Sequence, residues 1–115
     1  MSAQVVASTS DLEEGETLRL ELDAADGSQV EVALVLAEDG SFYAVNDVCS
    51  HGQVSLAEGE VDGVTLECWL HGSTFDLASG KPTCLPATRP VATYPVTIEG
   101  DDVLIDVDSP RLAQA

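Results

Sequence analysis

The decisive stretch of this 115-residue chain is residues 49–76, which read CSHGQVSLAEGEVDGVTLECWLHGSTFD. Both histidines of the chain lie in it, and each follows a cysteine, as C-x-H at residues 49–51 and as C-x-x-H at residues 68–71. The 16 residues between the two pairs, 52–67, allow one loop, a short strand and a second loop. Two thiolates and two imidazoles on two loops can together hold one metal centre.

The residues alone leave two other interpretations open. A lone histidine is usually a surface or satisfied core residue and a lone cysteine a small buried one, but here no histidine stands alone. A zinc ion with a Cys₂His₂ ligand set is the chemical alternative. Zinc modules usually place two ligands of one type together, whereas here each loop supplies one thiolate and one imidazole. This arrangement favours two irons bridged by sulfides, because each loop can then reach across the cluster.

The rest of the chain has the pattern of β-strands. Apolar and polar residues alternate at 18–22 and 30–36, and the strand predicted at 41–46 follows the hairpin signal Asp39-Gly40. Residues 93–98 and 103–107 form a closing pair across a turn. Because the runs are short and bounded by Gly, Asp or Pro, we expect an all-β antiparallel sandwich or small barrel. Residues 9–14 are the best candidate for a single helical turn.

The chain length predicts a single domain, residues 1–115. Between about residue 47 and about residue 90, glycine and proline dominate and the strands shorten, which indicates a loop-rich insertion in the β base. Residues 109–115 are expected to form a loosely ordered tail.

The composition is strongly acidic, with 21 Asp and Glu against 4 Lys and Arg and a formal net charge of −17. This charge argues against nucleic acid and anionic membranes as partners. It favours solubility or steering toward a basic patch on a protein partner, and the two are compatible. Three cysteines, an odd number, and a start without signal-peptide character predict a cytoplasmic location and metal binding rather than disulfides. No apolar run approaches the length of a membrane span.

Residues 49–76 resemble the two cluster loops of Rieske iron–sulfur domains, C-S-H-G and C-W-L-H-G-S-T-F-D. The likeness continues through G-K-P at 80–82 and L-P-A at 85–87, which resemble the loop that covers the cluster, and through 94–103. The resemblance implies an antiparallel β-sandwich base with a small cluster-binding subdomain at about 47–90, holding one [2Fe–2S] cluster. Cys49 and Cys68 would then ligate one iron, and His51 and His71 the other.

Several neighbours of the ligands are candidates for tuning the cluster or docking a partner. Gly52 and Gly72 either let backbone amides approach the sulfurs or are ordinary turn residues. Trp69, the one tryptophan, either packs against the subdomain or anchors a partner. Cys84 has no ligand partner in the family pattern, and we expect an ordinary thiol there, with a redox or alternative-ligand role as the alternative. The full set of tuning or docking candidates is Gly52, Trp69, Gly72, Ser73, Phe75 and Pro86.

Departures from the family pattern predict a low reduction potential. High-potential Rieske proteins of cytochrome bc complexes have an extra cysteine in each cluster loop, where this chain has Val54 and Leu70. Phe75 stands where those proteins place a tyrosine that donates to a cysteine sulfur, while Ser73 remains as a donor. Fewer hydrogen bonds to sulfur and an acidic surface stabilise the reduced cluster less. We therefore expect a midpoint near the low end of the Rieske range, about −150 mV.

This pattern resembles the soluble ferredoxins of bacterial ring-hydroxylating oxygenase systems. The resemblance implies an electron-transfer component and not an enzyme. Its transient partners would be a flavin-dependent ferredoxin reductase and a terminal oxygenase or another acceptor metalloprotein. A role in iron–sulfur cluster assembly or in redox-responsive regulation is the alternative, and a zinc-stabilised interaction module is a third. Oxygenase activity needs a further two-histidine, one-carboxylate iron site, for which no histidine is left.

Overall fold

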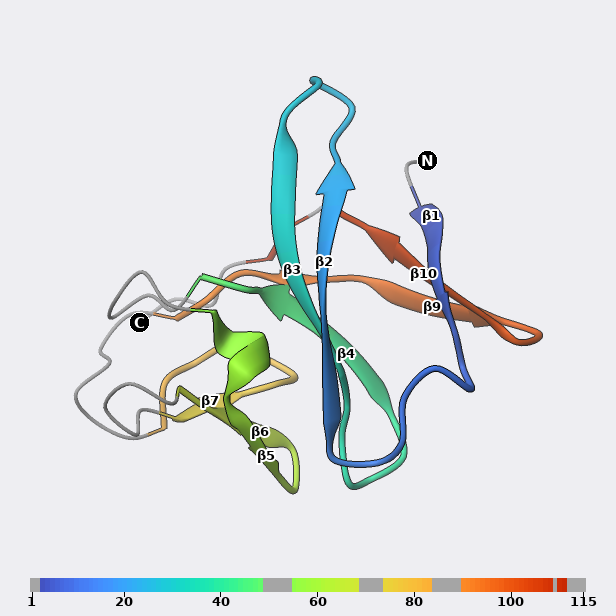
Figure 1. The fold of residues 1–115 in the computed structure, drawn as a ribbon. Helices are drawn as coiled ribbons and strands as arrows, with labels where there is room; N and C mark the ends of the chain where they lie inside the picture. Colours follow the sequence, from blue (N-terminus) through green and yellow to red (C-terminus); the bar gives the residue numbers. More distant parts are fainter. Residues whose placement is uncertain (1–2, 49–54, 69–73, 84–89, 109, 112–115) are drawn as a thin grey trace.

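The computed structural model describes residues 3–48, 55–68, 74–83, 90–108 and 110–111 (Figure 1). Within these ranges the strands form three antiparallel sheets, in the orders β1-β10-β9, β2-β3-β4-β8 and β5-β6-β7. The elements are β1 (Ala3–Ser8), β2 (Glu16–Asp23), β3 (Gln29–Leu36), β4 (Phe42–Asn46), the 3₁₀-helix η1 (Leu56–Glu58), β5 (Glu60–Asp62), β6 (Thr65–Glu67), β7 (Thr74–Asp76), β8 (Thr93–Tyr94), β9 (Val96–Glu99) and β10 (Asp102–Asp106). The all-β antiparallel prediction is confirmed, and no helix in the described ranges is long and apolar enough to cross a membrane.

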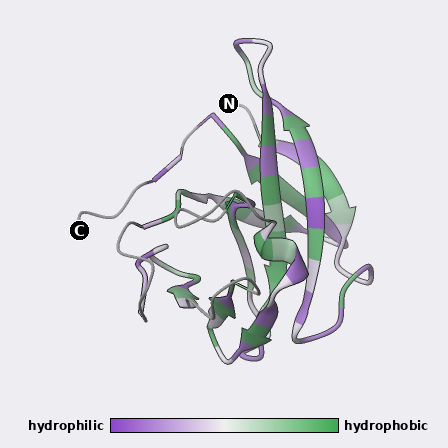
Figure 2. Ribbon diagram, turned by 60° about the vertical axis from the view of Figure 1, so that its left-hand side comes forward, coloured by the Kyte–Doolittle hydropathy of each residue, from purple (hydrophilic) through white to green (hydrophobic). Residues whose placement is uncertain are grey.

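Residues 32–37, from the second half of β3 to the residue after it, are buried on both faces, because they lie between two hydrophobic cores. The even-numbered residues from 32 to 36 pack in the core that also contains Val103 and Ile105 of β10. Ala33, Val35 and Ala37 pack in a second core, with residues of η1, β6 and β7. Polar and apolar residues alternate along β2, and Figure 2 shows such an alternation of colours along a long strand, in keeping with the two-residue period of a strand.

The predicted hairpin at Asp39-Gly40 joins β3 to β4. Gly40 has a φ of +83°, which glycine adopts without steric cost. The amide of Ala37 donates to the carbonyl of Ser41 at 3.0 Å and closes the turn. The register of β2, β3 and β4 therefore follows from alternation and turn chemistry together.

The strand predicted at 93–98 is divided between two sheets. Strand β8 pairs with β4, whereas β9 pairs with β10 in the predicted closing hairpin. Pro95 lies between β8 and β9 and has no backbone N–H to offer a neighbouring strand. Its carbonyl accepts a hydrogen bond from the amide of Asp106 at 3.1 Å, so the chain changes sheets at the proline.

Three features of the chain ends differ from the sequence analysis. Strand β1 was not expected, because residues 3–8 alternate poorly; it pairs with β10 through a register shift between Val5 and Ala7. The helical turn expected at 9–14 is wrong, since these residues form turns and bends and no helix; the amide of Asp11 donates to the carbonyl of Ser8 at 3.0 Å in one such turn. Arg111, expected in a loose tail, exchanges two backbone hydrogen bonds of 2.8 Å with Thr93.

The small sheet β5-β6-β7 lies between β4 and β8 in the sequence and forms a separate layer beside the base, as Figure 1 shows. Its residues Leu66 and Phe75 are directly opposite each other across β6 and β7. Both side chains are buried in the second core, against the odd-numbered face of β3. This sheet carries the segment that the sequence pattern singled out.

Candidate metal centre

Of the four predicted ligands, Cys68 belongs to the described part of the structure, and Phe75 is the described member of the predicted tuning set. The remaining candidates lie outside the described residues, namely Cys49, His51, Gly52, Trp69, His71, Gly72, Ser73, Cys84 and Pro86. The described part of the site consists of Cys68 and the segments that flank three ranges, 49–54, 69–73 and 84–89.

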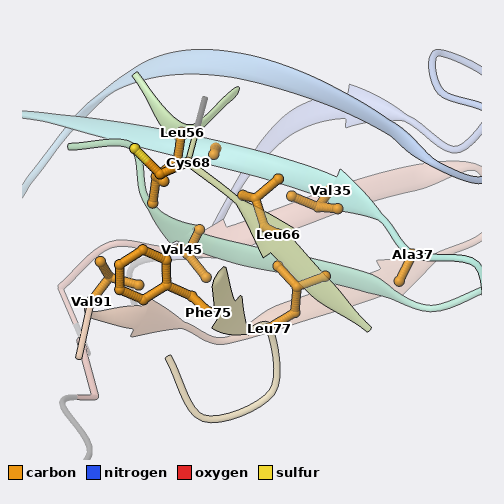
Figure 3. Close-up of a cluster of buried hydrophobic side chains, with 10 residues drawn as sticks. Val35, Ala37, Val45, Leu56, Leu66, Cys68, Phe75, Leu77 and Val91 are labelled. Carbon is orange, nitrogen blue, oxygen red and sulfur yellow. The ribbon is translucent and has the colours of Figure 1, made fainter. Parts of the chain in front are cut away.

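Cys68 follows β6 directly, and its side chain is fully buried. It shares the second core with Leu56, Phe75 and Val91 (Figure 3). In Figure 3 the sulfur lies at one end of the labelled group of side chains. Apolar neighbours exclude water around this sulfur, and solvent exposure is one of the factors that set the potential of a cluster. A thiolate ligand of an iron–sulfur cluster fits this position.

The flanks of all three ranges meet in that same core. Leu56 lies two residues after range 49–54, Phe75 two residues after range 69–73, and Val91 two residues after range 84–89. All three side chains are buried in one cluster with Cys68. The fold thus brings together segments next to both predicted ligand pairs, although they are far apart in the sequence.

Asp47, which the sequence pattern did not single out, links the residues before range 49–54 to the residues after it. Its side chain is 1% exposed, and its Oδ1 accepts hydrogen bonds from the hydroxyl of Ser55 and the amide of Ala57, both at 2.9 Å. Its carbonyl accepts the amide of Leu56 at 2.6 Å. The available signal was the residue type, because aspartate often hydrogen-bonds to nearby backbone amides and so shapes loops.

The other two ranges are closed by backbone pairing. Glu67 and Thr74 lie opposite each other across β6 and β7, on the two sides of range 69–73. Thr83 donates its amide to the carbonyl of Thr74 at 2.7 Å, and Val91 donates its amide to the carbonyl of Gly80 at 2.8 Å, across range 84–89. A Cβ at position 80 would lie 2.0 Å from the carbonyl oxygen of Val91, so this close approach requires glycine.

Arg19 on β2 places a cation beside the buried carboxylate. Its Nε donates to Oδ2 of Asp47 at 3.2 Å, while its Nη atoms donate to Glu21 at 3.2 Å and Glu31 at 2.8 Å. The hydrogen bond to Glu21 and the negative charges of Glu31, Glu21 and Asp47 raise the pKa of Arg19. The guanidinium therefore stays charged and links β2, β3 and the residue that follows β4.

A family model described as the Rieske [2Fe-2S] domain matches residues 2–95 of the chain. The chain therefore belongs to the Rieske [2Fe–2S] family, and its cofactor is a [2Fe–2S] cluster. The predicted donor set of two cysteines and two histidines and the buried side chain of Cys68 both fit this group. The family match thus favours the [2Fe–2S] cluster over a zinc ion with a Cys₂His₂ ligand set.

Individual relatives narrow the class further. The ferredoxin subunit of 3-phenylpropionate/cinnamic acid dioxygenase from Escherichia coli (strain K12) is 46% identical over 98 residues, which are 84% of this chain and 86% of the relative. The ferredoxin of carbazole 1,9a-dioxygenase from Nocardioides aromaticivorans IC177 has a TM-score of 0.81 at 33% identity, over 91% of this chain and 97% of that chain. A chain from the complex of reduced oxygenase and oxidized ferredoxin in carbazole 1,9a-dioxygenase has a TM-score of 0.78 at 31% identity, over 89% and 99%. The protein is a ferredoxin of the Rieske type.

Proposed function

We propose that this ferredoxin takes one electron at a time from a flavin-dependent reductase and delivers it to a terminal oxygenase or another acceptor metalloprotein. Two similarities support the proposal: one relative is named as a dioxygenase ferredoxin subunit, and one similar structure is a complex of oxygenase and ferredoxin. The protein is an electron-transfer component, and catalysis belongs to its partners. We place it in the cytoplasm, because an odd number of cysteines suits a reducing compartment.

The cluster ligands that we propose are Cys49 and Cys68 on one iron and His51 and His71 on the other. The observation that carries this assignment is the buried core shared by Cys68 and the flanks of both ligand pairs. When bound, the cluster accepts and releases one electron. The chain buries Cys68 away from water and holds the residues on either side of the proposed ligand segments by hydrogen bonds. We further propose that residues of about 47–90 form the subdomain devoted to this task.

The net charge of −17 suits a carrier that must meet two proteins in turn and leave each of them. Electrostatically steered encounters are fast, and their strength falls with salt, so they are readily reversed. We propose that both partners present basic surfaces. Trp69, which lies between the proposed ligands Cys68 and His71 in the sequence, stays a predicted docking or packing residue.

An anaerobic redox titration followed by electron paramagnetic resonance and metal analysis tests this function. We expect a Rieske-type signal on reduction, with a midpoint of about −150 mV. Cys68→Ser should abolish the signal, whereas Cys84→Ser, the matched cysteine control, should leave signal and midpoint unchanged. The reduced protein should be reoxidised by a purified ring-hydroxylating oxygenase.

Each contrary result bears on a different part of the proposal. A positive midpoint contradicts the low-potential assignment, and a Rieske signal that persists in Cys68→Ser contradicts the ligand set. A protein that contains zinc and no iron overturns the carrier function. If purified ring-hydroxylating oxygenase does not reoxidise the reduced ferredoxin, the proposed acceptor is contradicted.

A further inference from the structure

The side chain and backbone of Asp47 connect the two sides of range 49–54. Its Oδ1 accepts from Ser55 and Ala57, and its carbonyl accepts from Leu56. Its neighbour Val48 forms an isolated antiparallel bridge with Ser55. Residues 47–48, before the range, are thus hydrogen-bonded directly to residues 55–57, after it.

The segment leaving the range is also fastened to the base of the fold. Ala57 in η1 gives its amide to Asp47 and receives at its carbonyl the hydroxyl of Thr17 from β2. The side chain of Leu56 is fully buried in the core beneath β3. Movement of Asp47 would therefore disturb η1, which is held against the base by Thr17 and by the burial of Leu56.

A buried carboxylate is costly unless it is hydrogen-bonded and paired. Asp47 is 1% exposed, and Arg19 is the cation that contacts its second oxygen, at 3.2 Å. The guanidinium is itself held by Glu21 and Glu31 on β2 and β3, whose side chains are 50% and 43% exposed. The carboxylate is therefore oriented from both sides, by the loop donors at Oδ1 and by Arg19 at Oδ2.

We propose that Asp47 is a positioning residue for the iron–sulfur centre, and that Arg19 holds its carboxylate in the orientation that closes range 49–54. This inference rests on the proposed function, in which Cys49 and His51 in that range are cluster ligands. Asp47 acts through the chain on which these ligands stand. A change at Asp47 or Arg19 therefore alters how the ligands are held while leaving the donor set complete.

The substitution Asp47→Asn separates the two sides of the carboxylate. An amide has one oxygen and one NH₂ group, so it cannot accept both from the loop and from Arg19. If its oxygen faces Ser55 and Ala57, the NH₂ group meets the N–H of Arg19, and two donors are opposed. Arg19→Gln removes the same contact from the exposed side, without opening a cavity in the core.

We would measure the g-values of the reduced protein, the midpoint potential and hydrogen exchange at the amide of Ala57, in the protein as isolated. Asp47→Asn and Arg19→Gln should each shift the g-values and the midpoint and raise exchange at Ala57 about ten-fold. The double variant should show no more than the larger single effect, because both changes break one contact. Glu99→Gln, the control, removes an exposed carboxylate on β9 that forms no ion pair with Arg19, and it should leave all three readouts unchanged.

Two outcomes would overturn the role of Asp47. One is unchanged g-values and exchange in both variants of a protein whose wild type gives a normal Rieske signal. The other is an equal shift in Glu99→Gln, which would indicate a general effect of net charge and not of the contact between Arg19 and Asp47. If Asp47→Asn does not fold, the exposed Arg19→Gln variant decides alone. Absence of a Rieske signal from the wild type would instead count against the proposed function.

Discussion

At the scale of residues, Phe75 and Cys68 show how the second core influences the predicted cluster ligand. Phe75 is 1% exposed on β7 and lies in the same buried group as Cys68. Its ring is apolar and has no hydroxyl to donate to a sulfur. Position 75 therefore stays a predicted tuning position, as the resemblance to Rieske proteins implies.

Phe75→Tyr should raise the midpoint potential by roughly tens of millivolts, because a phenolic O–H near the sulfur stabilises the reduced cluster. If the buried hydroxyl has no hydrogen-bond partner, the free energy of unfolding of the variant should also fall by about 1–3 kcal/mol. Phe42→Tyr, the same change in the base of the fold, is the matched control and should leave the midpoint unchanged. Redox titration of both variants makes the comparison, and an unaltered midpoint in Phe75→Tyr would refute the tuning role.

At the scale of elements, the segments flanking range 84–89 are held by a close backbone approach. Gly80 has a φ of +78° and accepts the amide of Val91, which leaves no space for a side chain. Gly27, in the turn between β2 and β3, has a φ of +89° with no atom within 4 Å of the Cβ position. The two glycines share a backbone conformation and differ in their surroundings.

Gly80→Ala should therefore destabilise the fold by about 2–5 kcal/mol, from left-handed backbone strain together with overpacking. Gly27→Ala should cost only the strain, about 1–2 kcal/mol. Urea unfolding of the two variants, followed by circular dichroism, gives the difference. Equal losses in the two variants would mean that the contact with Val91 relaxes without cost.

At the scale of the whole molecule, negative charge outweighs positive charge over the described surface. All 21 acidic residues lie within the described ranges, and Arg19, one of only 4 basic residues in the chain, is already engaged by three carboxylates. Self-repulsion of this kind opposes the compact state. The same charge that suits brief partner encounters therefore lowers stability at low salt.

The melting temperature should rise by a few degrees when ionic strength increases from about 0.01 M to about 1 M, because the screening length falls from about 30 Å to about 3 Å. Neutralising two exposed carboxylates near the β9–β10 turn, Glu99→Gln with Asp101→Asn, should raise the melting temperature at low salt and reduce the gain from added salt. Thermal unfolding across a salt series measures both. A melting temperature that falls with salt would show that attractive ion pairs outweigh the repulsion.

The sequence alone predicted the cluster and most long strands, because motif spacing, alternation and turn residues are local signals. The spacing of cysteine and histidine at 49–51 and 68–71 predicted the cluster, and the family match bears it out. Alternation along 18–22 and 30–36 and the turn at Asp39-Gly40 predicted β2, β3 and β4, because a strand alternates side chains across two faces. The β9–β10 hairpin followed from the same kind of signal.

Tertiary structure decided what depends on partners distant in the sequence. The pairing of β1 with β10, the change of sheets at Pro95 and the burial of the second face of β3 each require an element that packs from elsewhere. The contact between Arg19 and Asp47 joins residues 28 positions apart. Such a contact leaves no periodic trace in the sequence, because it arises only when β2 and the end of β4 are both placed against β3.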